Sequence, residues 1–306
     1  MKLAVIGSNM TDLTSYVNRM PRPGETLEST GFTVGRGGKG ANQAIAAARC
    51  GAEILMLSCV GGDVFGEATI ANFKANGIDV SHLKRIQALQ SGTATIVVDT
   101  NGQNCIVIHK GANNALLPED VDAAEEALKT CSMILLQLEI PLDTVRRAVE
   151  VGHRNGVPIL LNPAPAKAEL DMETVCACDF FVPNETELSL LSGRKTDTRQ
   201  EIEAAAMELI RRGLSHVIVT MGARGALWMT QEGAKYVEAH MVKAVDTTGA
   251  GDAFIGCFAA HYVRGGNVLD AMRAGCDFAA LSVMRRGAQA SYPTQEEVEA
   301  FLAEHV

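Results

Sequence analysis

Short apolar segments alternate with amphipathic or alanine-rich segments along most of this chain, and this alternation restricts its possible folds more than any other feature. The apolar segments are typical of buried strands, whereas the intervening segments repeat apolar residues with the period of a helix. Strands separated by helices predict an α/β fold, in which a mostly parallel central sheet is covered by helices on both faces. We expect strands at residues 2–6, 54–60, 133–138, 159–162, 180–182 and 216–220, and helices at 42–50, 67–76, 142–154, from Pro118 onward and over the C-terminal part after residue 220.

The composition is that of a globular chain and excludes several classes of protein. Of the 306 residues, 47% are hydrophobic and 21% are charged, so a large core can form and whole-chain disorder is excluded. The net charge of −9 argues against a nucleic-acid or anionic-membrane surface, so an anionic substrate needs its own local positive site. The apolar runs are too short to span a bilayer, and the stretch after Met1 predicts a first strand rather than a signal peptide.

The eight cysteines are scattered along the chain, and none belongs to a C-x-x-C pair. This spacing argues against a zinc-finger or thioredoxin-like motif. Cys176 and Cys178 lie in an apolar context and are interpreted as buried filler rather than a ligand pair. The pattern predicts reduced cysteines in a cytoplasmic protein.

Two segments interrupt the alternation of strands and helices. Residues 12–36 contain Pro21, Pro23 and Gly24 between short alternating stretches, and residues 92–110 contain Asn101-Gly102 between two β-type runs, which predicts a hairpin. Because neither segment has a helix of its own, we expect the two to pair as a small β lid; a peripheral β decoration is the alternative. No repeat or linker marks a second domain, so residues 1–306 are interpreted as one α/β domain with this lid.

The first glycine-rich segment, residues 35–40, fits the pattern G-x-G-x-x-G but not its usual context. A dinucleotide-binding motif directly follows the first strand, whereas this segment follows the lid-like stretch, and Gly40 stands where a P-loop has Ser or Thr. The segment still offers glycines that admit a ligand to the backbone, a helix N-terminus, and Lys39 and Asn42 as polar groups suited to a sugar. Tight packing of the helix on the sheet is the alternative; it accounts for Ala41 but not for Lys39 or Asn42.

The second glycine-rich segment, residues 246–252, places three small residues before an acid at the start of a helix. The N–H groups of Gly249, Ala250 and Gly251 are expected to form a cradle for an anion such as phosphate. A carboxylate in a phosphate site is repulsive unless it takes part in the chemistry, so Asp252 is a candidate base that accepts the proton of an attacking hydroxyl. The alternative is that Asp252 only caps the helix.

Together, residues 37–42 and 246–252 resemble the two signatures of the ribokinase (PfkB-type) carbohydrate kinases. Further matches lie between them in the order typical of the family, at Leu138-Glu139, Asn162-Pro163-Ala164-Pro165, residues 183–187 and Thr220-Met221-Gly222. The resemblance covers the full length of the chain. It implies a ribokinase-like fold, with a central mostly parallel sheet flanked by helices and a small β-sheet lid through which two chains often pair as a homodimer.

The resemblance also implies a role for each matching residue. The implied reaction transfers the γ-phosphoryl group of MgATP to a sugar hydroxyl, with Asp252 as catalytic base and Gly249, Ala250 and Gly251 as the anion hole. Contacts with a pentose substrate are expected at Met10, Asp12, Gly38, Lys39, Gly40, Asn42, Glu139 and Asp252. Contacts with the nucleotide are expected at Asn184, Thr220, Gly222, Ala223, Arg224, Gly225, Gly251 and Cys276. A Mg²⁺ site is expected at Asn184 and Glu187, and a site for an activating K⁺ at Asp246, Thr248, Ser282, Arg285, Gly287 and Ser291.

Single matches also have plainer interpretations. Asn184 and Glu187 suit a hard cation that prefers oxygen ligands and keeps some of its waters, but the same residues fit an ordinary helix-capping pattern. Asp12 alone fits a turn, and Glu139 alone fits a solvated strand end. The functional interpretation is favoured because all these residues occur together, in one order and along one chain.

One departure from the family pattern bears on the substrate. Ribokinases usually have Asn two positions before the sugar-binding Asp, whereas Met10 stands two positions before Asp12 here. Methionine cannot donate a hydrogen bond, and a buried hydroxyl without a partner costs about 1–3 kcal/mol. Residues 7–10 also resemble the bacterial 2-deoxyribose kinases of this family. The hypothesis is that 2-deoxy-D-ribose is preferred and D-ribose is secondary; alternatively, Met10 only packs, and Asp12 and Asn42 still select ribose.

Other functions compete with a pentose kinase. The acceptor of the phosphoryl group could be another sugar, a nucleoside or a sugar phosphate, and Arg19, Arg22 and Arg36 near the lid keep a phosphorylated sugar open. A non-catalytic sugar-binding regulator would have a degraded catalytic motif, but Asp252 and its glycines are intact. A nicotinamide-dependent oxidoreductase is the remaining alternative, and it rests only on the glycine pattern at residues 35–40.

Overall fold

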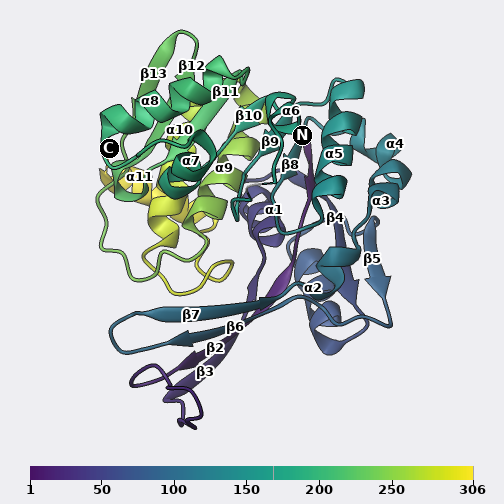
Figure 1. The fold of residues 1–306 in the computed structure, drawn as a ribbon, viewed down its shortest axis with the longest axis vertical. Helices are drawn as coiled ribbons and strands as arrows, with labels where there is room; N and C mark the ends of the chain where they lie inside the picture. The colour runs from purple at the N-terminus through teal and green to yellow at the C-terminus, as the bar shows by residue number, and fades with distance from the viewer. Residues whose placement is uncertain (168, 306) are drawn as a thin grey trace.

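A central sheet organises the molecule, which the computed structural model describes over residues 1–167 and 169–305. In this part of the chain, nine strands pair in the order β13-β12-β11-β10-β9-β8-β1-β4-β5 (Figure 1). Every pair of neighbours from β11 to β5 is parallel, as the alternation of strands and helices predicts. The strands are β1 Lys2–Ile6, β4 Glu53–Gly61, β5 Leu83–Ile86, β8 Met133–Leu136, β9 Ile159–Leu161, β10 Phe180–Phe181, β11 His216–Thr220, β12 Ala226–Thr230 and β13 Gly233–Val237.

The edge of this sheet departs from the sequence prediction. Helices were expected throughout the region after residue 220, but β12 and β13 form an antiparallel hairpin that continues the sheet beyond β11. The hairpin needs only the two residues between β12 and β13 to reverse the chain, so no helix is required to cross the sheet. Strand β5 at the opposite edge was also not predicted, because four residues with two basic side chains give little strand signal.

Helices cover both faces of the sheet, as expected for a parallel sheet. Alternate residues of β1 show this directly: Leu3 and Val5 belong to one apolar cluster, and Ala4 and Ile6 to the other. The first cluster includes residues of α1 Lys39–Arg49, α2 Val64–Ala75, α9 Ala250–Gly265 and α10 Val268–Ser282. The second includes residues of α3 Pro118–Ala123, α4 Glu125–Leu128, α5 Leu142–Arg154, α6 Met172–Cys176, α7 Glu185–Ser192 and α8 Arg199–Arg211. The last helix, α11 Gln295–His305, contacts α10.

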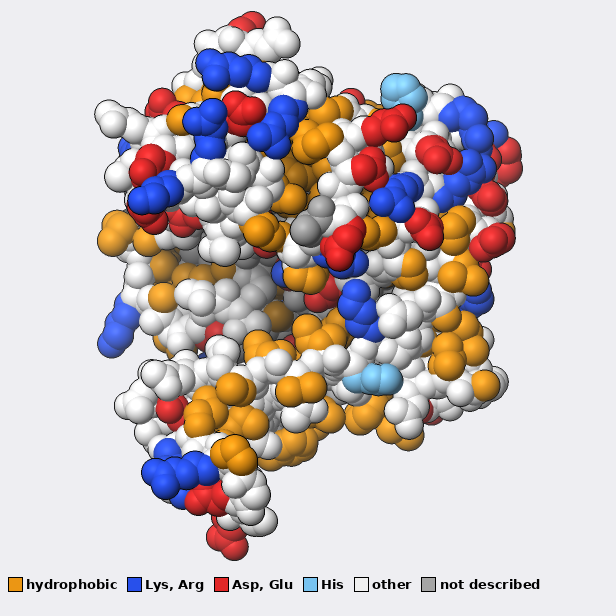
Figure 2. All heavy atoms as spheres, viewed as in Figure 1, with side chains coloured by type: hydrophobic (Ala, Val, Ile, Leu, Met, Phe, Trp, Pro, Cys, Tyr) orange, Lys and Arg blue, Asp and Glu red, His pale blue; other side chains and the backbone are white. Residues whose placement is uncertain are grey.

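A separate small sheet projects from the core at the level of α2 (Figure 1). Among the described residues it has four strands in the order β3-β2-β6-β7, with β2 Met10–Tyr16, β3 Gly31–Gly37, β6 Thr93–Val98 and β7 Asn104–His109. The antiparallel pairing of β6 with β7 confirms the predicted hairpin. Phe32, Val34 and Val107 of this sheet are more than half exposed. The sheet therefore presents apolar side chains to solvent, which also appear on its surface in Figure 2.

The connections bring the chain repeatedly to one edge of the main sheet. Strands β1, β8, β9, β10 and β11 are parallel, so the residues that follow each of them meet at their common carboxyl edge. Strand β2 of the small sheet begins only four residues after β1 ends, which fixes the small sheet beside this edge. Figure 2 shows the surface hollowed between the core and the small sheet. None of the helices in residues 1–167 and 169–305 has the length and apolarity to cross a bilayer.

Candidate active site

Polar side chains that follow the parallel strands are buried at the carboxyl edge of the sheet. Ser8, which follows β1, donates a hydrogen bond of 2.5 Å to Oε2 of Glu139, which follows β8. The same oxygen accepts the backbone N–H of Lys39, the first residue of α1, at 2.9 Å. Glu139 therefore joins two strand ends to the start of a helix. A solvated strand end, the plainer interpretation of Glu139, is excluded because the residue is only 6% exposed.

The carboxylate of Asp252 lies at the centre of a second buried group. Asp252 is in the first turn of α9 and is 5% exposed. Its Oδ2 accepts from Nδ2 of Asn42 at 2.9 Å, and its Oδ1 accepts from Nε2 of Gln43 at 3.0 Å. Both donors lie on α1, so this helix orients a carboxylate that another helix carries. Asn42, predicted to contact a sugar, in this structure contacts Asp252.

The two amide groups that hold Asp252 are themselves fixed by further amides. Oδ1 of Asn42 accepts from Gln289 at 3.0 Å, and Oε1 of Gln43 accepts from Gln137 at 2.6 Å. Because both amide oxygens already accept, their NH₂ groups are turned toward the carboxylate. Sequence reasoning missed Gln43, Gln137 and Gln289. Only the position of Gln43, directly after Asn42 in the first glycine-rich segment, could have indicated one of them.

The start of α9 has the form of an anion cradle. Gly249 precedes the helix with φ of 76°, a conformation that favours glycine, and a Cβ there would lie 2.8 Å from Ala288 and from the hydroxyl of Tyr292. At Gly251 a Cβ would meet no atom within 4 Å, so space remains beside the helix. The N–H of Ala250 donates to Thr247 O at 3.2 Å. Helix geometry leaves the N–H groups of Gly251 and Asp252 directed out of the helix end, where a phosphate would be stabilised.

A polar cavity of about 160 Å³ joins the cradle to the strand ends. Burial alone would lower the pKa of the Lys39 ammonium, but the carboxylates of Asp252, Glu139 and Glu187 outweigh this effect and raise the pKa. Lys39 therefore remains charged and supplies the local positive site that an acidic protein needs for an anionic substrate. The cavity is lined by Lys39, Asn162, Ala164, Asn184, Glu187, Thr220, Thr247, Gly249, Ala250, Gly251, Asp252 and Ile255.

The small sheet contributes Met10 and Asp12 to the other side of the site. Both lie on β2 two residues apart, so their side chains share one face of the strand. A Cβ at Gly37 on the paired strand β3 would collide with the Asp12 carboxylate, so glycine is needed there. Burial, and then the negative charge of Glu139, raise the pKa of Asp12 to about 6. Met10 is 4% exposed, and it lies outside the two apolar clusters of the described core.

Gly38 and Gly40 admit the close approach of two backbone segments at the start of α1. Gly38 has φ of 88°, and a Cβ there would lie 2.6 Å from Asn9 Cα. A Cβ at Gly40 would lie 2.6 Å from the backbone nitrogen of Ser8. These glycines let α1 begin directly against the loop that carries Ser8 to Met10. This close packing also explains how Lys39 reaches the site, and the sugar contacts expected at Gly38 and Gly40 stay a prediction.

A larger cavity of about 470 Å³ adjoins the polar one across the start of α9. Most of the residues expected to contact a nucleotide line it: Asn184, Thr220, Gly222, Ala223, Gly225, Gly251 and Cys276. Arg224 does not line this cavity but forms an ion pair with Glu185, at the start of α7. Apolar side chains such as Val242, Phe254 and Val283 also line the cavity. Its mixture of apolar walls and a few polar groups suits a flat heteroaromatic ring.

Asn184 and Glu187 form a complete capping box at the start of α7. Oδ1 of Asn184 accepts the N–H of Glu187 at 2.8 Å, and Oε2 of Glu187 accepts the N–H of Asn184 at 2.9 Å. The capping interpretation is therefore correct. It does not exclude the metal-site interpretation, because both residues line the same polar cavity as Asp252. Burial raises the pKa of Glu187, and the backbone N–H of Asn184 opposes this effect.

The residues expected to hold K⁺ lie on the loop before α9, at the last residue of α10 and on the loop that follows α10. Oδ2 of Asp246 accepts the N–H of Gly287 at 2.8 Å, and Oδ1 accepts the hydroxyl of Thr248 at 2.7 Å. Burial would raise the pKa of Asp246, but these hydrogen bonds hold it below its usual value. The Arg285 side chain pairs with Glu297. The hydroxyls of Ser282 and Ser291 donate to carbonyl oxygens of their own segments, both at 2.8 Å.

The fold and the site define a class of protein: a buried carboxylate at an anion cradle lies between a nucleotide-sized cavity and a small sheet. The pattern of the pfkB family carbohydrate kinases matches residues 1–295 of the chain. The chain belongs to this family and is an ATP-dependent carbohydrate kinase.

Individual relatives agree with this assignment over their whole lengths. The chain is 53% identical over 303 residues to deoxyribokinase from Salmonella typhi, which covers 99% of each chain. It is 38% identical over 309 residues to ribokinase from Schizosaccharomyces pombe, covering 98% of this chain and 97% of the relative. The solved structure of Arabidopsis thaliana ribokinase complexed with ribose and ATP matches with a TM-score of 0.92 at 30% identity, covering 98% of each chain. These matches confirm the fold class predicted from the sequence.

Proposed function

We propose that this kinase transfers the γ-phosphoryl group of ATP to the 5-hydroxyl of 2-deoxy-D-ribose, with D-ribose as a secondary substrate. The high identity to a deoxyribokinase and the lower identity to ribokinases support a pentose as acceptor. The observation that carries the preference for the deoxy sugar is Met10, which is buried two residues before Asp12 and shares its face of β2.

In the proposed reaction, Asp252 accepts the proton of the 5-hydroxyl as its oxygen attacks the γ-phosphorus. A bond forms between these two atoms, and the bond from phosphorus to the bridging oxygen breaks and releases ADP. Asn42 and Gln43 hold the carboxylate in place, so little reorganisation is needed during the transfer. The N–H groups at the start of α9 and the Lys39 ammonium stabilise the charge on the transferring group.

The donors present fit the Mg²⁺ that accompanies ATP in this family. Glu187 and Asn184 supply oxygen atoms at the polar cavity, and Mg²⁺ prefers oxygen ligands while keeping several waters. When bound, the ion supplies positive charge beside the phosphates. The capping box holds both side chains in place before ligands arrive. We assign Asn184 and Glu187 to this site, with Thr220, Gly222, Ala223, Gly225 and Cys276 around the nucleotide.

The proposed K⁺ site uses the loops that meet at Asp246 and Gly287. The backbone N–H groups of Val245 and Asp246 donate to Val283 O, at 2.7 and 3.1 Å, which ties the loop before α9 to the end of α10. Because the Asp246 side chain already accepts three hydrogen bonds, the ligands of K⁺ would be mainly carbonyl oxygens. An ion there would brace the loop that leads into the anion cradle.

The preference for a deoxy sugar follows from the chemistry of residue 10. A buried methionine gives a sugar hydroxyl no donor and only a weak acceptor, so the hydroxyl would lose its water without a replacement. A ring carbon without a hydroxyl avoids this cost and packs against the thioether. Asp12, whose pKa burial and then the nearby charge of Glu139 raise, would bind the remaining hydroxyl groups together with Glu139.

The test compares kcat/KM for 2-deoxyribose and ribose in the native protein and in Met10→Asn. The substitution should lower the deoxyribose-to-ribose ratio of kcat/KM by about 10-fold, since one hydrogen bond to a buried hydroxyl is gained. Met20→Asn, at a partly exposed position outside the site, is the matched control. An unchanged ratio in Met10→Asn would show that residue 10 does not select the sugar.

A homodimer formed through the small sheet is a second proposal. Strands β3 and β7 are the edges of this sheet, and Phe32, Val34, Ile106, Val107 and Ile108 are exposed apolar side chains on it. Such a surface favours pairing with a second copy of the chain, which would bury these side chains.

A cytoplasmic location remains a prediction, supported by the eight free thiols.

The alternative acceptors are less well supported by the site. Arg19 pairs with Glu25, and Arg36 donates to the carbonyl of Ala68 on α2, so both guanidinium groups are engaged away from a sugar phosphate. A non-catalytic regulator does not require a carboxylate held by two amide donors at an anion cradle. A phosphorylated acceptor would become the better proposal if a sugar phosphate were turned over faster than either pentose.

A further inference from the structure

A third cavity, of about 330 Å³, lies away from the two cavities of the active site. None of its described lining residues belongs to the nucleotide-sized cavity or to the polar cavity. It opens among α1, α9, α10 and α11, with the C-terminal end of α1 on one side. Three of its lining residues, Cys50, Cys257 and His261, are not used by the kinase site.

These three side chains converge on one point. The two Sγ atoms and a ring nitrogen of His261 all lie within 4.8 Å of one another. Cys257 and His261 are four residues apart on α9 and therefore share one face of that helix. Cys50 directly follows the last residue of α1, more than two hundred positions earlier in the chain. Only the packing of α1 on α9 creates the cluster, so the spacing of the cysteines in the sequence could not reveal it.

Charged groups of α9 and α10 surround the cluster. Arg264 donates to the backbone carbonyl of Cys50 at 2.7 Å, which fixes the end of α1 against α9. Asp277 lines the same cavity and interacts electrostatically with His261. Two cysteine thiols and an imidazole thus face one another at the wall of a cavity.

We propose that Cys50, Cys257 and His261 form a binding site for a thiophilic divalent cation such as Zn²⁺. Two sulfurs and one imidazole nitrogen are ligands that zinc prefers, and zinc accepts three protein ligands with a water in the fourth tetrahedral position. The cavity provides room for that fourth ligand. Binding displaces the thiol protons to solvent, so affinity rises with pH.

The site has a structural consequence for the kinase. Helix α1 supplies Asn42 and Gln43 to the carboxylate of Asp252 on α9, and the cysteine cluster joins the same two helices further along. With a cation bound at the cysteine cluster, α1 and α9 would be connected at both ends of their contact, because the hydrogen bonds to Asp252 already connect the other end. We therefore expect the cation to stabilise the helix pair against unfolding, because it binds the folded arrangement only.

The test uses Co²⁺ as a spectroscopic probe of reduced, chelator-treated protein without nucleotide. A tetrahedral site with thiolates gives a sulfur-to-cobalt charge-transfer band that Mg²⁺-type oxygen sites do not give. One equivalent of Co²⁺ should produce this band in the native protein, and Zn²⁺ should abolish it by displacement. Cys257→Ala should remove the band, and His261→Gln should weaken cobalt binding at least about 10-fold.

The matched control is Cys178→Ala, which removes a buried cysteine on the opposite face of the sheet and should leave the band unchanged. His261 is only partly buried, so His261→Gln tests the site even if Cys257→Ala folds poorly. In thermal unfolding, Zn²⁺ should raise the Tm of the native protein and of Cys178→Ala, but not that of His261→Gln. Absence of the band in native protein, or its persistence at full strength in His261→Gln, would overturn the proposal.

Discussion

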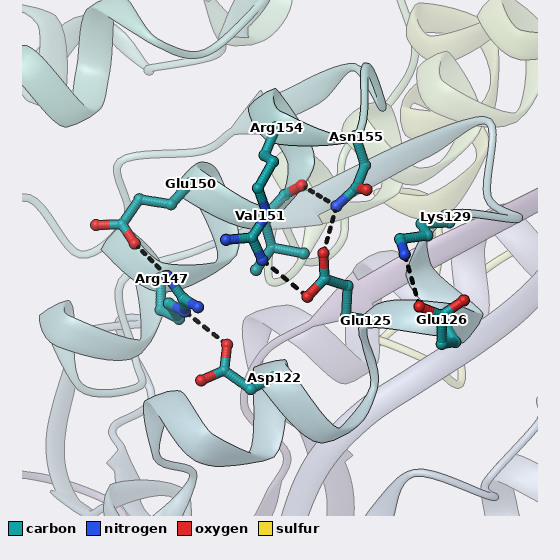
Figure 3. Close-up of polar contacts among 9 residues, drawn as sticks. All are labelled: Asp122, Glu125, Glu126, Lys129, Arg147, Glu150, Val151, Arg154 and Asn155. Atoms are coloured by element: carbon teal, nitrogen blue, oxygen red, sulfur yellow. Dashed lines mark hydrogen bonds and ion pairs between the residues drawn. The ribbon is translucent and has the colours of Figure 1, made fainter.

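Two polar networks of this protein use similar groups in opposite environments. On the surface formed by α3, α4 and α5, Arg147 bridges Asp122 and Glu150 at 2.6 and 2.7 Å (Figure 3). In the active site, Asp252 accepts from Asn42 and Gln43 at 2.9 and 3.0 Å. The surface distances are shorter, and the surface groups carry full opposite charges. Distance and formal charge would therefore rank the surface network as the stronger one.

Solvent exposure reverses this ranking. The side chains of Asp122 and Glu150 are 46% and 61% exposed, so water and salt screen their attraction to Arg147. Asp252 is 5% exposed, and each amide lost from its surroundings leaves a polar group without a partner. The comparison teaches that buried neutral amides around one charge are the more sensitive network, although the surface carries many ion pairs.

The largest expected effect is that of Asp252→Asn, which keeps the size of the buried side chain but removes the proposed base and one of its two hydrogen-bond acceptors. We expect kcat to fall by about 10³-fold, because proton transfer from the hydroxyl loses its acceptor. Binding of the sugar should change little, and isothermal titration would measure it. Near-normal turnover in Asp252→Asn would contradict the catalytic role of this carboxylate.

Gly251→Ala tests the space beside that carboxylate. A Cβ meets no atom there in the structure, so the fold should tolerate it, but a phosphate in the cradle would be displaced. We expect kcat/KM for ATP to fall by about 100-fold while the Tm is unchanged or higher. Gly265→Ala, at the other end of α9 with equally open surroundings, is the matched control and should retain full activity. Equal activity in Gly251→Ala and Gly265→Ala would show that the phosphate does not bind beside Gly251.

Gln43→Leu breaks the buried network but leaves the Asp252 side chain itself unchanged. The Nε2 donors of Gln137 and the Oδ1 of Asp252 lose partners, and we expect kcat to fall by about 30-fold through misplacement of the base. The KM for ATP should stay near its native value, since Gln43 does not line the nucleotide-sized cavity. The free energy of unfolding should decrease by about 1–3 kcal/mol. A purely structural role would lower stability and leave kcat of the folded enzyme intact.

Asp12 makes a buried carboxyl testable by pH, because its pKa of about 6 lies within the range in which activity can be measured. If the carboxylate accepts hydrogen bonds from the sugar, KM for the sugar should rise about 10-fold as the pH falls from about 8 to about 5. Asp12→Asn should bind the sugar more weakly, and its higher KM should be nearly independent of pH. The control Asp99→Asn, in the exposed turn of the same sheet, should keep the native profile.

The raised pKa of Asp12 also predicts how the free energy of unfolding changes with pH. The folded state favours the protonated form of Asp12, so its contribution is present below about pH 4 and is lost as the pH rises through about 6. Above that pH, Asp12→Asn should therefore unfold at a higher temperature than the native protein. The rise of the Asp12 pKa from its ordinary value of 3.8 to about 6 corresponds to at most about 3 kcal/mol. A lower Tm of Asp12→Asn at about pH 8 would contradict this sign.

The smallest effect belongs to the surface network. Arg147→Ala removes two ion pairs, yet we expect the Tm to change by less than about 2 °C and kcat not at all. Thermal unfolding should give a smaller difference at high salt than at low salt, because ions screen exposed pairs of this kind. A large loss of stability would mean that burial is not what separates the two networks.

Much of the fold was predictable because hydrophobic periodicity is a local property. The parallel strands of the main sheet other than β5, and helices such as α1, α2, α5 and α9, follow from the pattern of apolar residues, and Asn101-Gly102 indicates the β6–β7 hairpin. The β12–β13 hairpin was missed, since residues 226–237 have no such turn signal and were expected to be helical. A short edge strand such as β5 is stabilised by its neighbour rather than by its own sequence.

The candidate site was predictable only where a motif is contiguous. The residues 246–252 identify the cradle and Asp252, and the residues 37–42 identify Lys39 and Asn42. The groups that orient them, Gln137 and Gln289, lie in segments without any motif and reach the site through tertiary packing. The cluster of Cys50, Cys257 and His261 was missed for the same reason.

The sequence by itself determined most of the parallel strands and the chemical groups available to a phosphoryl-transfer site. Only the tertiary structure decided which of these groups meet, how deeply each is buried and which amides hold Asp252. The physical reason is that periodicity and turn chemistry act between neighbours along the chain. Burial, pKa shifts and hydrogen bonds between residues such as Asn42 and Asp252 arise from contacts across more than two hundred positions.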